Sequence, residues 1–67
     1  MKSTYQVKRV LDGKTEVIHT DSQKRKIESF FNGLRRNFKK GGIWVRDIRI
    51  GYFELPALSV EYYITKE

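Results

Sequence analysis

Residues 24–42 read KRKIESFFNGLRRNFKKGG, and their apolar side chains repeat with the period of an α-helix. The apolar positions recur every three or four residues, which gathers them within about 100° of arc on one helical face. They are Ile27, Phe30, Phe31, Leu34 and Phe38. Gly41-Gly42 ends the pattern, because glycine accepts the left-handed conformation that terminates many helices. We therefore predict an amphipathic helix over residues 21–40.

A hairpin is predicted before this helix, over residues 4–20. Asp12-Gly13 is typical of a two-residue hairpin turn, since glycine accepts the positive φ that such a turn requires. The expected cross-strand pairs are Leu11–Lys14, Arg9–Glu16 and Val7–Ile18. One of these pairs joins opposite charges and another joins apolar side chains, which supports this register.

A second hairpin is predicted after the helix, over residues 43–65. Residues 43–52 and 58–65 are rich in β-branched and aromatic side chains, and Pro56 belongs in the loop because proline cannot donate to a strand ladder. The expected pairs are Tyr52–Leu58, Ile50–Val60, Arg49–Glu61 and Ile48–Tyr62. The element order is then ββαββ. We predict one small α+β domain over residues 1–67, with two layers: the amphipathic helix packed on a four-stranded, mainly antiparallel sheet.

Composition excludes several classes of function. The 67 residues include no cysteine and one histidine, His19, so disulfides, cysteine zinc sites and metal sites of several imidazoles are excluded. The acidic residues are scattered, and Gly41-Gly42 is not followed by the lysine of a phosphate loop. We expect a non-catalytic protein without cofactor or metal. No apolar run approaches the roughly 20 residues that span a bilayer, and no signal peptide is recognised, so we expect a cytoplasmic protein without membrane contact.

The positive charge of the chain is concentrated in the predicted helix. Residues 24–40 contain seven basic residues and one acid, Glu28, which accounts for the whole net charge of +6. The basic side chains from Arg25 to Lys40 span about 22 Å at 1.5 Å per residue. A solvated helix face usually mixes charge signs, whereas Arg36 and Lys40 repel each other at i,i+4. This arrangement is typical of a surface that contacts phosphates.

Our leading hypothesis is a small nucleic-acid-binding or nucleic-acid-associated protein that contacts DNA or RNA through this helix. The candidate binding residues are Lys24, Arg25, Lys26, Asn32, Arg35, Arg36, Lys39 and Lys40. One alternative is an adaptor or inhibitor that recognises an acidic protein surface. A second alternative is a homo-oligomeric structural protein, in which the charge only keeps a small domain soluble.

Aromatic side chains outside the helix are weaker evidence for a binding surface than the basic side chains of the helix. Tyr52 is expected on the apolar face of its hairpin, which leaves Tyr63 alone on the polar face. One exposed ring is a weak stacking platform, since sheets that stack bases present two or three rings in register. Trp44 either anchors a binding partner or packs in the core. Phe53 lies in the expected loop, where it either invites a partner or folds over the edge of the core.

The opening residues Thr4-Tyr5-Gln6-Val7, the single helix and the strands after it resemble dodecins, which are small flavin-storing shells of similar length. Dodecins have one strand before the helix, whereas Asp12-Gly13 predicts a hairpin there. Because the topologies conflict, no dodecin function is carried over to this chain.

Overall fold

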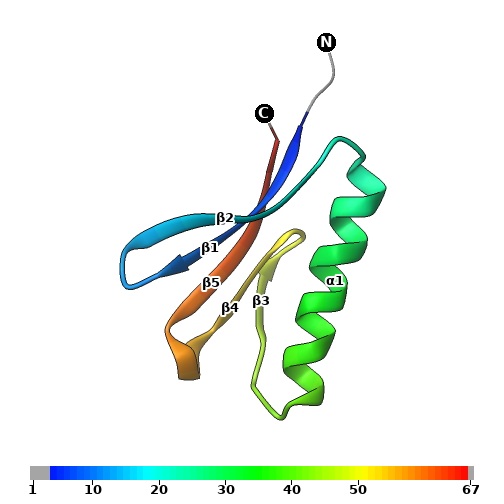
Figure 1. Cartoon of the computed structure of the whole chain (residues 1–67). Coiled ribbons are helices and arrows are strands. Elements are labelled where there is room, and N and C mark those ends of the chain that lie inside the picture. The colour runs from blue at the N-terminus through cyan, green and yellow to red at the C-terminus, as the bar shows by residue number, and fades with distance from the viewer. Residues whose placement is uncertain (1–3, 67) are drawn as a thin grey trace.

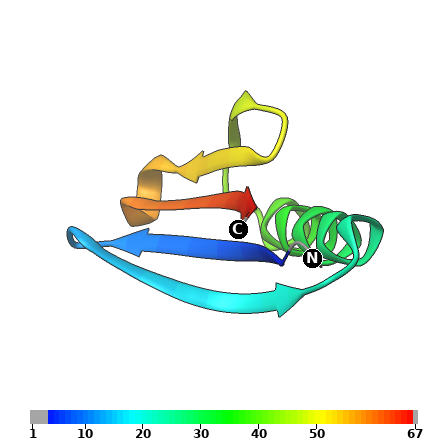
Figure 2. The same ribbon diagram turned by 90° about the horizontal axis from the view of Figure 1, so that it is seen from above.

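The computed structural model of the protein describes residues 4–66, which form an α+β fold of two layers. The elements are β1 (Tyr5–Leu11), β2 (Lys14–Asp21), α1 (Lys24–Lys40), β3 (Arg46–Arg49), β4 (Tyr52–Leu55), the 3-10 helix η1 (Pro56–Leu58) and β5 (Val60–Lys66). The strands make one antiparallel sheet in the order β2-β1-β5-β4-β3. Helix α1 runs along one side of this sheet (Figure 1), and β2 and β3 are its edge strands (Figure 2).

The predicted N-terminal hairpin is confirmed, with one change of register. Leu11 lies opposite Lys14, and Arg9 lies opposite Glu16, whose Oε2 accepts a 2.6 Å hydrogen bond from Arg9 Nη2. Val7 lies opposite His19 and not opposite Ile18, because a β-bulge shifts the register next to it. Asp12 and Gly13 both have positive φ, as a two-residue hairpin turn with a right-handed twist requires.

The prediction of four strands in the order ββαββ is wrong, because residues 43–52 do not form one strand. The chain reverses at Ile50-Gly51, where Gly51 has a φ of +77° that an extended strand does not accommodate. Two short strands, β3 and β4, therefore replace the long one, and the element order is ββαβββ in a five-stranded sheet. The connection to β5 is η1, which begins at Pro56.

The expected pairs of the second hairpin change with this turn. Strand β4 pairs with β5 so that Tyr52 lies opposite Tyr63, and Phe53 lies opposite Tyr62. The side chain of Phe53, expected in a loop, is fully buried. Because side chains alternate across a strand, burial of Phe53 places Tyr52 on the opposite face of the sheet.

The core lies between α1 and the sheet. Its buried side chains are Val7, Ile27, Phe31, Val45, Phe53, Leu55, Val60 and Tyr62. The apolar stripe predicted on the helix supplies two of them, while Leu34 and Phe38 pack at the margin. Phe30 is more exposed, and its ring stacks on His19 of β2 at 4.1 Å between centroids. The apolar stripe is therefore the side of α1 that packs against the sheet.

Both ends of α1 are set by local hydrogen bonds. The helix begins at Lys24 and not at Asp21, because Asp21 still belongs to β2 and its Oδ1 accepts a 2.9 Å bond from the Gln23 amide. At the other end, the amide of Gly42 donates to Lys39 and the amide of Ile43 donates to Phe38, which is a Schellman motif. No helix in the described part of the chain has the length and apolar character needed to cross a membrane.

Candidate nucleic-acid interface

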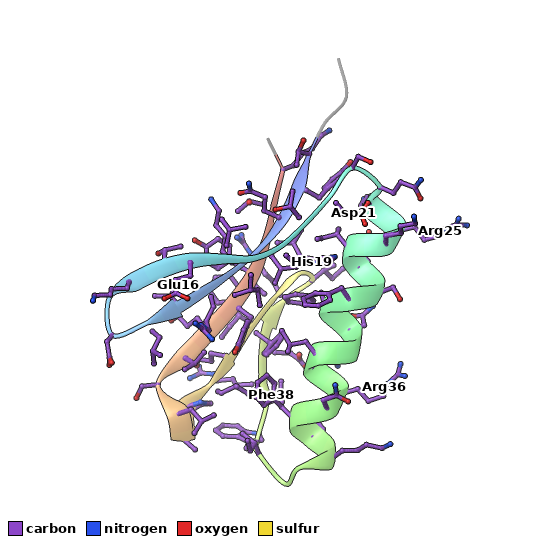
Figure 3. The ribbon with its side chains drawn as sticks, in the orientation of Figure 1. Glu16, His19, Asp21, Arg25, Arg36 and Phe38 are labelled. Atoms are coloured by element: carbon purple, nitrogen blue, oxygen red, sulfur yellow. The ribbon has the colours of Figure 1, made fainter. Side chains whose placement is uncertain are left out.

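The outer side of α1 faces away from the sheet, because the apolar stripe on its inner side packs against the sheet. Figure 3 shows the Arg25 and Arg36 side chains extending from the helix on the side away from the strands. Of the eight candidate residues, all but Arg35 are exposed. The structure therefore brings most of the predicted basic side chains onto one accessible surface.

Two of the candidate residues are engaged by carboxylates. Arg35 Nε lies 2.8 Å from Asp47 Oδ1, and Arg35 Nη2 lies 3.3 Å from Asp47 Oδ2, so this pair connects α1 to β3. Lys24 Nζ lies 3.8 Å from Glu28 Oε1, one helical turn away. These side chains are about half exposed, so each pair contributes little to stability. Arg35 positions β3 against the helix, and it has less freedom to meet a ligand.

The other basic side chains of α1 have no carboxylate of residues 4–66 within 4.0 Å. We call Arg25, Asn32, Arg36, Lys39 and Lys40 the basic ridge, since helical geometry places them together opposite the apolar stripe. Lys26 lies one turn before Phe30, which contacts β2, so Lys26 belongs to the flank of the helix on the β2 side. The ridge therefore carries four cations and one amide.

The face of the sheet opposite α1 holds a second group of polar and aromatic side chains that sequence reasoning missed. Tyr52 and Tyr63 are cross-strand partners whose rings lie 5.7 Å apart between centroids and 18° from parallel. The Arg49 guanidinium lies 5.5 Å from the centre of the Tyr52 ring, and Lys8 is the β1 partner of Tyr63. We call Arg49, Tyr52, Tyr63 and Lys8 the tyrosine row.

One hydrogen bond fixes the first ring of this row. The Tyr52 hydroxyl donates to Glu61 Oε2 at 2.9 Å. This hydrogen bond, together with partial burial and the negative charge of Glu61, raises the pKa of Tyr52 above its ordinary value of 10.0. The phenol therefore stays protonated and oriented through the neutral pH range. Gly51, a turn residue inside an apolar run, was the signal in the sequence that could have placed Tyr52 beside Tyr63.

Apolar side chains are exposed around β3, at the edge of the sheet. Ile50 is 103% exposed, Trp44 is 66% exposed and Ile48 is 46% exposed. Trp44 is therefore not a core residue. The apolar loop tip expected at Phe53 does not exist, because Phe53 and Leu55 are both fully buried in β4.

A groove of about 370 Å³ separates α1 from the Ile50-Gly51 turn and the adjoining ends of β1 and β5. Phe31 and Ile64 supply apolar lining, and Lys24 and Glu28 supply charge. Within residues 4–66, histidine, aspartate and glutamate side chains do not gather in groups of three that could hold a metal ion.

Comparisons with protein-family models, with curated proteins and with solved structures give no match for this chain. Two surfaces that carry exposed cations are the basic ridge of α1 and the opposite face of the sheet.

Proposed function

We propose that this protein binds nucleic acid without catalysing a reaction, and that the basic ridge of α1 contacts the sugar–phosphate backbone. The observation that carries the proposal is the set of exposed cations on the ridge with no carboxylate of the described residues beside them. When lysine and arginine side chains without a carboxylate partner contact the phosphates of a nucleic acid, they displace the counterions condensed on it, and this release favours binding. Asn32, in the middle of the ridge, adds an amide that can bind the backbone or a base edge.

The ridge also destabilises the helix slightly, which argues against a purely solubilising role. Arg36 and Lys40 lie one turn apart and repel each other. The first turn of α1 contains no acidic residue and begins with Lys24, Arg25 and Lys26, so positive charge meets the positive end of the helix dipole. Only Lys39 and Lys40 at the other end are favourably placed. A binding role explains why such an arrangement is present.

The test compares two charge reversals of equal size in different places. Arg25→Glu with Arg36→Glu removes charge from the ridge, and Lys14→Glu with Lys66→Glu removes the same charge from exposed positions on β2 and β5. Both variants have a net charge of +2 instead of +6. Affinities for short duplex and single-stranded DNA and RNA are measured at two or more salt concentrations.

We expect the ridge variant to bind more weakly and to lose about two units of the slope of log affinity against log salt, about one per cation that meets a phosphate. The control variant is expected to keep most of its affinity and slope. Equal losses in the two variants would show that only net charge matters. Absence of binding by the wild-type protein at low salt would refute the proposal altogether.

A second candidate function is association with another protein chain, and the exposed apolar residues around β3 favour it. Exposed large apolar side chains at a sheet edge favour an interaction site, and Trp44 and Ile50 are large enough to anchor a contact. The partner is then an acidic protein or a second copy of this chain. Sedimentation of the protein alone over a range of concentrations distinguishes these two partners.

A further inference from the structure

The tyrosine row crosses four adjacent strands of the sheet. Arg49 of β3 pairs with Tyr52 of β4, Tyr52 pairs with Tyr63 of β5, and Tyr63 pairs with Lys8 of β1. Strands in a sheet lie about 4.8 Å apart, so the row is about 14 Å long. It is therefore one continuous line of side chains, with two rings in the middle and a cation at each end.

This line lies on the side of the sheet that α1 does not cover. Val7 and Tyr62 are buried against the helix, so their neighbours Lys8 and Tyr63 point to the other side. In Figure 1, α1 occupies one side of the sheet, and no described element lies on the other. Both tyrosines are half-buried, which leaves part of each ring accessible.

The carboxylates near the row are already engaged. Glu54 Oε1 lies 3.1 Å from Arg46 Nη1, and Glu61 accepts the hydrogen bond from Tyr52. Arg49 and Lys8 have no carboxylate of the described residues within 4.0 Å. The two cations that bracket the rings are therefore available to an anionic ligand, and that ligand meets aromatic surface between them.

We propose that the tyrosine row is a second binding site, and that it takes unpaired nucleotides of single-stranded DNA or RNA. A base stacks on the face of the Tyr63 ring that Tyr52 does not cover, since Tyr63 and the Arg49 guanidinium already lie against the Tyr52 ring, while Arg49 and Lys8 contact the phosphates on either side. A base has accessible faces only when it is unpaired and unstacked, so a duplex does not fit this flat row. The site lies on a different surface from the basic ridge and does not depend on it.

The test uses ligands that differ only in their bases. Fluorescent octathymidylate and octauridylate are compared with an abasic octamer that has the same number of phosphates. We expect the wild-type protein to bind the base-bearing octamers at least ten-fold more tightly, in line with the usual strength of base–aromatic stacking. The Arg25→Glu/Arg36→Glu variant is expected to keep this ratio, so failure of the ridge proposal and failure of this one give different results.

Variants of one ring provide the matched comparison. Tyr63→Leu is expected to lower affinity for the base-bearing octamers by about ten-fold and to leave affinity for the abasic octamer unchanged. Tyr63→Phe keeps the ring and is expected to bind like the wild-type protein. Circular dichroism and thermal melting establish that both variants are folded.

A measurement on the wild-type protein keeps the proposal open to refutation even if Tyr63→Leu does not fold. A stacked base shifts the ring protons of Tyr63 upfield, and NMR titration with octauridylate is expected to show this shift. Equal affinity for the abasic and base-bearing octamers would overturn the proposal. It would also be overturned if the ring protons moved with a proline-rich peptide and not with the oligonucleotide.

Discussion

Replacing Phe53 by alanine is expected to remove most of the folding stability of this protein. The Phe53 side chain is 0% exposed, and its ring lies 4.9 Å from the ring of Phe31, 5.3 Å from that of Tyr62 and 6.5 Å from that of Phe38. It joins α1 to β4 and β5 at the centre of the core. Truncation of a buried phenylalanine to alanine costs about 3–5 kcal/mol, because it loses transfer free energy and leaves a cavity.

That cost is comparable with the whole stability of the domain. At about 0.05–0.15 kcal/mol per residue, a chain of 67 residues has a free energy of unfolding of about 3–10 kcal/mol. Phe53→Ala is therefore expected to be largely unfolded, or to melt far below the wild-type protein. Ile27, also 0% exposed, offers a smaller change: Ile27→Val is expected to cost about 1 kcal/mol and to lower Tm by roughly 4–8 °C.

Thermal and urea denaturation followed by circular dichroism measure these effects. Ile50→Ala is the control, because Ile50 is 103% exposed and its loss is expected to change stability by less than about 0.5 kcal/mol. The packing argument would be refuted if Phe53→Ala melted within a few degrees of the wild-type protein. It would also fail if Ile50→Ala cost as much as Ile27→Val, since Ile50 would then lie in a core.

Two further predictions concern the end of α1 and the tyrosine row. Gly42→Ala is expected to lower the free energy of unfolding by about 1 kcal/mol, because Gly42 has a φ of +82°. Gly33→Ala is expected to raise the free energy of unfolding, because Gly33 lies inside the helix and a Cβ there meets no atom within 4 Å. Urea denaturation measures both changes. The pKa of Tyr52 is raised in the folded state, so its contribution to stability is complete below pH 10 and is lost as pH rises through the folded pKa. Glu61→Ala removes both the hydrogen-bond acceptor and the negative charge, and ultraviolet absorbance titration, with Tyr52→Phe as reference, is expected to show the pKa of Tyr52 moving back toward 10.0.

The parts of the fold that were predicted correctly depend on local signals. The helix follows from apolar residues at helical spacing and from Gly42, which forms the Schellman motif at its end. The first hairpin follows from Asp12-Gly13, because a two-residue turn fixes the register of its strands. The bulge opposite Val7 was not predictable from this turn, since it arises farther along the ladder.

The parts that were missed depend on one turn and on non-local pairing. Trp44, Ile48 and Ile50 made residues 43–52 look like one strand, yet all three are exposed, and Gly51 turns the chain between two short strands. Once that turn is misplaced, Phe53 is assigned to a loop and Tyr52 to the wrong face of the sheet. The tyrosine row could therefore not be predicted from the sequence, because its residues are brought together only by the pairing of β4 with β5 and of β5 with β1.

The two proposed surfaces lie on opposite sides of the protein for one physical reason. The apolar side of α1 and the apolar side of the sheet bury each other, so the polar side of each layer must face outward in opposite directions. The contacts proposed for the ridge are mainly those of its four cations with phosphates, so its affinity is expected to fall steeply with salt. The row has two cations beside its rings, against four on the ridge, so the affinity proposed for it is expected to fall less steeply with salt. A salt titration with a short single strand, carried out on the wild-type protein and on the Arg25→Glu/Arg36→Glu variant, therefore separates the two surfaces within one protein.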